Sequence, residues 1–272
     1  MYVLIANGFF GLVVMGTLIV THAMHWGWAI LLGVLSFVAG QGLIGYLLQR
    51  KVKGAMEEVQ RIMVEGQKKM QQKIKLWQTR PPGSMKDAQL EMERDQKRIV
   101  EQTLEASKKL ERFNGWVPLM GKQIATLRIQ LYWSVKNFKK VDELMPRAVF
   151  MEPMMIGVKL ARMYMLQTDI AAIEKFFNKQ MIKVRYGQGA MLYSMMAWIY
   201  VQRNDLDKAN KVLIEASEKT ENDVIKRNRE HLANNHAAQF SNTGLGDEWY
   251  GFHLEQPKVK QQRQSAFAKR HF

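Results

Sequence analysis

Two things are missing from this chain: cysteine throughout, and formal charge from its first 49 residues. The absence of cysteine excludes a disulfide-stapled fold and agrees with a domain that faces the cytosol. The absence of Asp, Glu, Lys and Arg from Met1 to Gln49 matters more, because a charged side chain is most costly in lipid. Arg50, Lys51 and Lys53 then follow together. We therefore expect the chain to begin in a membrane and to continue at its surface.

Motifs for catalysis are missing as well. The sequence has no nucleophile elbow and no zinc signature. The run Gly244-Leu245-Gly246 lacks the preceding strand and the following Lys and Ser/Thr that a phosphate-binding loop needs. Asp247 and Glu248 have no visible nucleophile or base with which to perform acid–base chemistry. We therefore expect a protein that is not an enzyme and that uses no cofactor and no metal.

The uncharged region divides into two apolar segments, Tyr2–Val20 and Trp28–Leu48, around a short polar turn. About 20 apolar residues in a helix cross the ~30 Å hydrocarbon layer, so residues 1–49 are expected to form a transmembrane helical hairpin. In the alternative interpretation the first segment is a cleaved signal peptide. The basic start and the small-residue cleavage site of such a peptide are absent, which favours the hairpin.

The basic residues near the helix ends predict the orientation of the hairpin. The turn has no Lys or Arg, whereas residues 50–80 hold nine, against three Glu. Lys and Arg close to membrane helices stay on the cytoplasmic side. We predict an integral protein of the plasma membrane or a bacterial inner membrane, with both termini in the cytoplasm.

Antiparallel pairing of the two segments places Gly16 opposite Gly33 and Gly8 opposite Gln41, with Asn7 one step away. Two glycines that face each other allow the helix backbones to approach closely. A buried amide in lipid requires a partner, so one prediction is a hydrogen bond between Asn7 and Gln41. The alternative is that both amides reach interfacial water or another subunit.

His22 and His25 lie three residues apart in the turn and raise a separate hypothesis. This spacing can put two imidazoles on one helix face, where they would bind haem or a divalent metal in a redox subunit. No carboxylate or thiol accompanies them. The interpretation that we favour is a pair of polar residues at the outer interface.

The formal net charge of +15 points to an anionic surface. Because the excess is strongest next to the predicted hairpin, anionic lipid headgroups are the nearest match. Nucleic acid is not an expected partner, since the chain has no ligand Cys, no aromatic RNA-binding strand and no recognition-helix pattern.

Residues 50–83 carry one apolar stripe along an amphipathic helix and end in a break at Arg80-Pro81-Pro82-Gly83. The helix is expected to continue out of the membrane, and three uses are open. It can form a coiled coil with a second copy of the chain. It can lie on anionic lipid. It can pack on the domain that follows. The basic residues expected to face lipid are Arg50, Lys51, Lys53, Lys68 and Lys69.

A second long helix is expected from Ser84, whose side chain would cap it, to about Phe113. This segment, residues 84–117, would cap a repeat that begins after it. The repeat is visible when the chain is aligned on Tyr132, Tyr164 and Tyr200. Three residues before each tyrosine stand Ile129, Ala161 and Ala197, and nine after stand Val141, Ile173 and Ala209. Short turns fall together at Lys136-Asn137, Thr168-Asp169 and Asn204-Asp205.

This pattern over residues 118–220 resembles the tetratricopeptide repeat family, and the segment from Tyr200 to Ala209 is its closest match. The departures are the larger Val141 and Ile173 in place of alanine and a missing first-helix tryptophan. The resemblance implies an all-α chain in which three antiparallel helical pairs stack into an α-α solenoid. Residues 221–239 would close the stack as a second cap. Residues 240–272 would be an aromatic loop and a basic tail.

In such a fold the first helix of each pair lines a concave face. The resemblance implies a partner-binding groove lined by Gln130, Trp133, Met155, Arg162, Met165, Met191 and Trp198. Trp, Met and Arg are residues that anchor partner segments. The competing interpretation is that the chain's own N-terminal helix or C-terminal tail fills the groove.

The functional hypothesis is a membrane-anchored scaffold that recruits or assembles proteins of a membrane complex. Tethering would raise the effective concentration of its partner at the membrane. Association with a second copy and contact with anionic lipid are further expectations. The alternative is a structural accessory subunit of a membrane enzyme or transport machine, which binds mainly through the hairpin.

Overall fold

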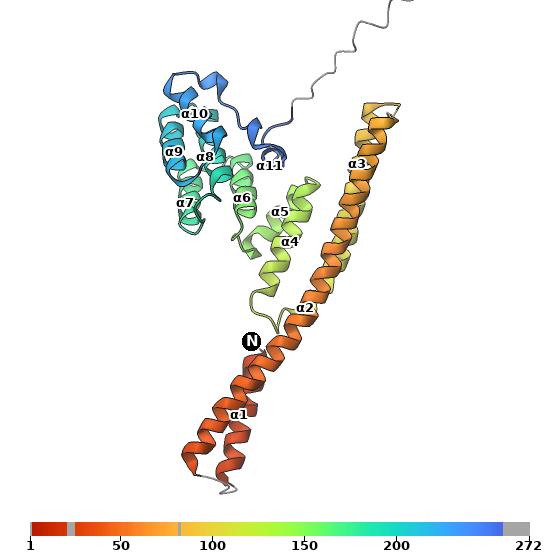
Figure 1. Cartoon of the computed structure of the whole chain (residues 1–272), viewed down its shortest axis with the longest axis vertical. Coiled ribbons are helices and arrows are strands. Elements are labelled where there is room, and N and C mark those ends of the chain that lie inside the picture. Colours follow the sequence, from red (N-terminus) through yellow and green to blue (C-terminus); the bar gives the residue numbers. More distant parts are fainter. Residues whose placement is uncertain (1, 21–24, 81–82, 258–272) are drawn as a thin grey trace, which may run out of the picture. The chain divides into compact units, whose positions relative to one another are not determined.

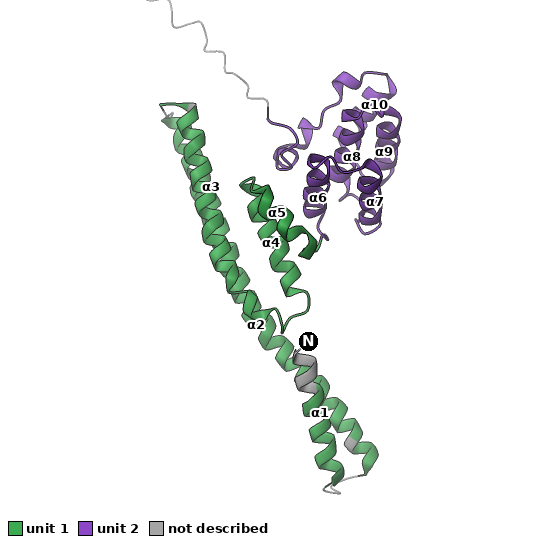
Figure 2. Cartoon of the chain, turned by 180° about the vertical axis from the view of Figure 1, so that it is seen from behind, with its two compact units in different colours: residues 1–149 green, residues 150–272 purple. Residues whose placement is uncertain are grey.

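A computed structural model describes residues 2–20, 25–80 and 83–257 of the chain. Every regular element in these ranges is a helix, so the all-α prediction is confirmed (Figure 1). The contacts divide the chain into one unit of residues 1–149 and another of residues 150–272 (Figure 2). Each unit is described separately below.

The first unit begins with α1 (Tyr2–Val20) and α2 (Trp26–Thr79), which pack against each other. Within the described residues, α2 is the helix that is long and apolar enough to cross a membrane, while the apolar stretch of α1, Gly8–Val20, is shorter. A signal sequence, or a core helix of a soluble protein, can have the same length and apolar composition. Only 6% of the apolar window in α2 is buried.

The predicted continuation of the second apolar segment into a basic helix is confirmed. The helix α2 runs for 54 residues without interruption, which corresponds to about 80 Å at 1.5 Å per residue. No proline falls between Trp26 and Thr79, and the helix ends one residue before Arg80, which precedes Pro81. Because proline disfavours a helical conformation in the residue before it, the sequence itself sets this end.

The contact between α1 and α2 corrects the predicted pairing of glycines. A side chain added at Gly16 would meet no atom within 4 Å, whereas one at Gly33 would meet Met15 at 3.0 Å and the carbonyl of Gly11 at 3.4 Å. Gly11 in turn lies against Phe37 at 3.2 Å. The close approach therefore joins Gly33 to Gly11, which lies five residues before the predicted partner Gly16 on α1. Antiparallel packing holds, but the local register depends on how Met15 and Phe37 fill the space.

The third helix, α3 (Met85–Lys108), packs along α2. Gly66 marks their closest approach, because a Cβ atom there would lie 2.7 Å from Ile99 Cγ1. Lys73 forms ion pairs with Glu91 (2.7 Å) and Asp95. Hydrogen bonds to both carboxylates raise the pKa of Lys73. Lys109 pairs with Glu58 at 2.8 Å, so the stripe on α2 packs within its own chain. Ser84 stands at the N-cap position of α3, but its side chain makes no capping hydrogen bond, contrary to our prediction.

Three pairs of helices follow at the predicted places. They are α4 (Met120–Ser134) with α5 (Phe138–Leu144), α6 (Pro153–Met165) with α7 (Ile170–Met181), and α8 (Ala190–Gln202) with α9 (Leu206–Lys219). Each first helix ends through a left-handed residue, namely Lys136, Gln167 or Asn204. The following amide bonds back to the carbonyl five residues earlier, for example Asp205 N–H to Tyr200 O at 3.0 Å. This helix-ending motif explains why the turns recur.

The residues that align in the repeat occupy equivalent buried positions. The six positions three residues before and nine after the tyrosines are completely buried, namely Ile129, Ala161, Ala197, Val141, Ile173 and Ala209. The larger Val141 and Ile173 are therefore accommodated inside their helical pairs. The first pair belongs to the first unit, and the other two belong to the second unit.

The remaining elements complete the two units. In the first unit, η1 (Glu111–Phe113) connects α3 to α4, and η2 (Met145–Arg147) follows α5. In the second unit, α10 (Asp223–Ala233) packs on α9 as the predicted C-terminal cap. Then come η3 (Ala237–Gln239), η4 (Thr243–Leu245) and the short α11 (Asp247–Tyr250).

We predict that Gly66→Ala destabilises the α2–α3 pair. The added methyl group would overlap Ile99, and overpacking of this kind costs about 1–3 kcal/mol, more than the gain of ~0.5–1 kcal/mol from replacing glycine in a helix. Gly54→Ala is the matched control, since a Cβ there meets nothing within 4 Å. This substitution should stabilise the helix. Thermal unfolding followed by circular dichroism in detergent measures both. A stabilising Gly66→Ala would show that the helices are not in close contact.

Candidate functional site

In the first unit, the predicted groove residues differ in exposure. The side chain of Gln130 is exposed on α4. Trp133 is buried, and its ring packs edge-on against Phe138 with 5.2 Å between centroids. Trp133 thus belongs to the core between α4 and α5, and it is a poor candidate for contact with a partner.

In the second unit, the predicted groove residues lie on α6 and α8, which contact each other. Met155 and Trp198 are buried. Arg162, Met165 and Met191 are half-buried. Of the five groove residues predicted in the second unit, these last three are the ones that present side-chain surface.

The chain's own C-terminal segment covers the rest of that face. The Trp249 ring packs edge-on against Trp198 with 5.9 Å between centroids. Glu255 accepts a hydrogen bond from each indole, at 2.7 Å from Trp198 Nε1 and 2.6 Å from Trp249 Nε1. Phe252 is completely buried and fills the space that Gly157 leaves open, where an added Cβ would lie 2.5 Å from its ring. The structure therefore supports the self-filled interpretation for this part of the groove.

A buried polar network holds the start of this segment. Asn242 donates to the carbonyl of Ser194 on α8 at 2.9 Å and accepts from the amide of Asn228 on α10 at 3.0 Å. The backbone amide of Ser241 donates to Asn228 Oδ1 at 3.0 Å. Buried amides with satisfied partners specify one geometry, because any other placement would leave polar atoms without partners. The loop from 240 onward is thereby positioned over α8.

An ionic contact links the outer helices of the second unit. Glu174 on α7 accepts from Lys208 (3.0 Å) and from the hydroxyl of Tyr200 (2.8 Å). The hydrogen bond from Lys208, followed by that from Tyr200, lowers the pKa of Glu174. Burial, and then the hydrogen bond to Glu174, raises the pKa of Tyr200. These shifts arise from a structural contact between two repeats.

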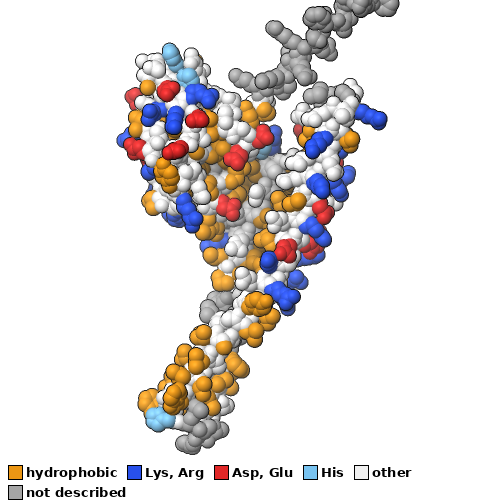
Figure 3. All heavy atoms as spheres, in the orientation of Figure 1, with side chains coloured by type: hydrophobic (Ala, Val, Ile, Leu, Met, Phe, Trp, Pro, Cys, Tyr) orange, Lys and Arg blue, Asp and Glu red, His pale blue; other side chains and the backbone are white. Residues whose placement is uncertain are grey.

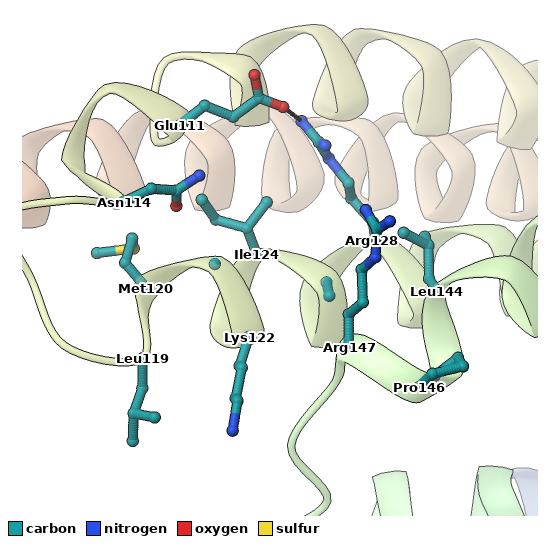
Figure 4. A pocket seen from close by; sticks show the side chains of 12 residues that line it. Glu111, Asn114, Leu119, Met120, Lys122, Ile124, Arg128, Leu144, Pro146 and Arg147 are labelled. Carbon is teal, nitrogen blue, oxygen red and sulfur yellow. Dashed lines mark ion pairs between the residues drawn. The ribbon is translucent and has the colours of Figure 1, made fainter.

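A pocket of about 660 Å³ lies in the first unit, between the start of α4 and η2. Figure 4 shows Arg128 reaching Glu111, while Leu119 and Lys122 point the other way. The ion pair from Arg128 to Glu111 measures 2.7 Å, and Arg128 Nε also donates to Ser107 Oγ at 3.1 Å. Lys122 and Arg147 line the pocket and form no ion pair with another described residue. The site is cationic, open and partly apolar.

Sequence reasoning missed the pocket and the role of Glu255. The signal for Glu255 was weak, since it is one carboxylate in a segment otherwise recognised for its aromatic residues. Leu119 gave no signal at all, yet its backbone adopts the left-handed conformation (φ 63°), which is uncommon for a branched residue.

The basic residues predicted to face lipid are all exposed on α2. They do not lie at one depth, however. A continuous helix carries Lys68 and Lys69 about 27 Å beyond Arg50, at 1.5 Å per residue. If the apolar part of α2 crosses a membrane, only Arg50, Lys51 and Lys53 remain near the headgroups. Lys53 also pairs with Glu57 at 3.8 Å.

Two predictions about the hairpin concern residues outside the described range. The side chain of Asn7 and all of His22 lie there, so the Asn7–Gln41 bond and the His22–His25 ligand pair stay untested. Gln41 Nε2 is buried without a hydrogen-bond partner among described residues. His25 caps α2, and its Nδ1 accepts from the amide of Gly27 at 3.3 Å. No cluster that could hold a metal ion occurs among the described residues.

No protein-family model matches the chain, and neither a curated protein nor a solved structure is significantly similar to it. The resemblance to tetratricopeptide repeats therefore depends on the repeat in the sequence and on the helical pairs described above.

We predict that Phe252→Ala loosens the C-terminal segment from α6 and α8. Truncating a fully buried phenylalanine costs about 3–5 kcal/mol, because a cavity remains beside Gly157. Ile182→Ala, at a side chain that is 86% exposed in the same unit, should change stability little. Limited proteolysis read by mass spectrometry should show new cleavage between residues 240 and 257 in the first variant only. Equal resistance of both variants would contradict the packing.

Proposed function

We propose that this chain is a membrane-anchored helical scaffold that holds partner proteins at the cytoplasmic surface of a membrane. In this proposal α1 and the apolar part of α2 form the anchor, and both termini are cytoplasmic. The three helical pairs form a tetratricopeptide-like module for protein contacts.

One observation carries the proposal. The part of α2 beyond the apolar segment shares a hydrophobic core with α3 and α4, made of Ala55, Val59, Ala106, Leu110, Phe113, Met120 and Ile124. Leu48 and Val52 pack against the same core. The candidate anchor is thereby joined to the first helical pair by packed side chains, and a flexible linker does not intervene. Such a joint suits a protein that positions its partners rather than one that merely retains them.

The exposed side chains of the hairpin are mostly apolar, which supports the proposal that lipid surrounds it. Figure 3 shows hydrophobic side chains over the visible face of α1 and the apolar part of α2, while Lys and Arg gather farther along the unit. Large side chains such as Phe9, Leu12 and Leu43 are more than half exposed. Apolar surface this extensive requires lipid or another protein to cover it.

The orientation can be tested because the chain has no cysteine of its own. Single substitutions Gly27→Cys, at the start of α2 beside the turn, and Lys68→Cys, on the basic part of α2, should react differently with a membrane-impermeant maleimide. We expect Gly27→Cys to react in intact cells and Lys68→Cys to react only after permeabilisation. Both proteins should resist extraction by alkaline carbonate.

Two results would overturn this topology. One is reaction of Lys68→Cys in intact cells, and the other is release of the chain by carbonate. Ile182→Cys, exposed in the second unit, provides the control for permeabilisation. Loss of an N-terminal tag from the membrane-bound protein would instead show that the first segment is a cleaved signal peptide.

A second candidate function is favoured by the covered groove. Because Trp249, Phe252 and Glu255 occupy the face of α6 and α8, the chain can also be an accessory subunit that binds its complex through the hairpin.

Matched substitutions distinguish the two functions. If the chain is a scaffold that binds through the helical pairs, replacing Met165 and Met191 with alanine should remove the proteins that copurify in mild detergent. The double variant Gly11→Leu with Gly33→Leu should then retain them. If the chain is an accessory subunit that binds through the hairpin, the reverse is expected, because the leucines disrupt hairpin packing. Gly45→Leu on α2, where a Cβ meets nothing within 4 Å, is the control for adding bulk. Quantitative mass spectrometry of the copurified proteins provides the measurement.

A further inference from the structure

The loop between η1 and α4 exposes two large apolar side chains to solvent. Trp116 is 44% exposed and Leu119 is 57% exposed. Leu119 sits in the left-handed region at φ 63° as the residue before α4, and its side chain points away from Glu111 (Figure 4). A left-handed leucine is energetically unfavourable, so packing of the neighbours Val117 and Met120 holds it there.

The position of this loop along α2 is set by the core. Val117 packs against the same cluster as Leu48 and Val52, the residues that flank the border where α2 changes from apolar to basic. The loop therefore packs on the core that begins at the end of the apolar segment of α2. At that level of a membrane protein, amphipathic tryptophan rings and basic side chains meet the headgroups.

The charges around the loop are those that an anionic surface requires. Three acidic side chains at this end of the unit are occupied by ion pairs: Glu111 with Arg128, Glu58 with Lys109, and Glu57 with Lys53. Lys122 and Arg147 line the pocket behind Leu119 and form no ion pair with described residues. The uncompensated charge at the loop is thus positive.

We propose that residues 116–122 and the pocket behind them form a second membrane contact, which docks on anionic phospholipid headgroups. This inference rests on the proposed anchor and adds to it. Trp116 and Leu119 enter the headgroup layer, while Lys122 and Arg147 bind the phosphates. The hairpin holds the chain in the bilayer, and this loop fixes the tilt of the first unit against the surface.

A fluorescent probe on the full chain tests the proposal. Leu119→Cys, labelled with an environment-sensitive dye and reconstituted into vesicles of phosphatidylcholine and phosphatidylglycerol, should show blue-shifted emission and quenching by lipids with a nitroxide near the headgroup. The control is Val64→Cys, a 54% exposed apolar position on α2 of the same unit. It lies about 24 Å beyond Leu48 on a continuous helix, so its dye should be quenched far less.

Charge dependence is the second arm. Adding Lys122→Gln and Arg147→Gln should lower the ratio of docked to undocked loop about fivefold for each charge removed. Omitting phosphatidylglycerol or raising the salt concentration should also reduce quenching at residue 119, because both weaken the attraction between charges. Trp116→Cys carries the same dye if Leu119→Cys alters the loop, and circular dichroism checks that the helices persist.

The outcomes separate this inference from the anchor. Vesicle flotation reports the anchor: a chain that fails to float overturns both. A chain that floats, but whose dye at residue 119 is quenched no more than at residue 64, overturns the docking loop alone. A blue shift without quenching by nitroxide lipid also overturns it, since a protein surface then covers the loop.

Discussion

The packing of α2 against α3 and α4 is the constraint on which the rest of the first unit depends. Ala55 and Val59 on α2, Ala106 on α3, Leu110 between α3 and η1, and Met120 and Ile124 on α4 bury one another just beyond the apolar segment. Without this core, α2 would be an isolated rod with one apolar stripe exposed. With it, the hairpin, the basic helix and the first helical pair become one body.

Small residues make this arrangement possible. Gly66 lets Ile99 approach the backbone of α2, and Gly11 and Gly33 do the same between α1 and α2. In the second unit Gly157 admits the ring of Phe252. In each case the missing side chain is replaced by a neighbour from another helix or segment. Van der Waals contact of this kind stabilises without charge, which suits both a protein core and a lipid environment.

The two units use their aromatic residues differently. In the second unit Trp198 and Trp249 face inward, and both indole N–H groups share one acceptor, Glu255. In the first unit Trp133 is likewise buried, whereas Trp116 is 44% exposed. An indole joins an apolar body to a polar N–H group, so it serves both in a core and at an interface. We infer that Trp116 is the tryptophan of this part of the first unit that is available to meet a surface.

The sequence alone determined the elements that depend on local pattern. Residues close together in the sequence determine three features: the charge border at Arg50, the break before Pro81 and the positions of the three helical pairs. It could not determine which surfaces meet, because several apolar faces were equally available to each helix. Only the tertiary structure decided that the stripe on α2 packs on α3, that Gly33 meets Gly11 and Met15 in place of Gly16, and that Phe252 and Glu255 cover the groove at Trp198. Those choices depend on shape and on the pairing of buried polar atoms between distant segments, and neither appears in the order of residues along the chain.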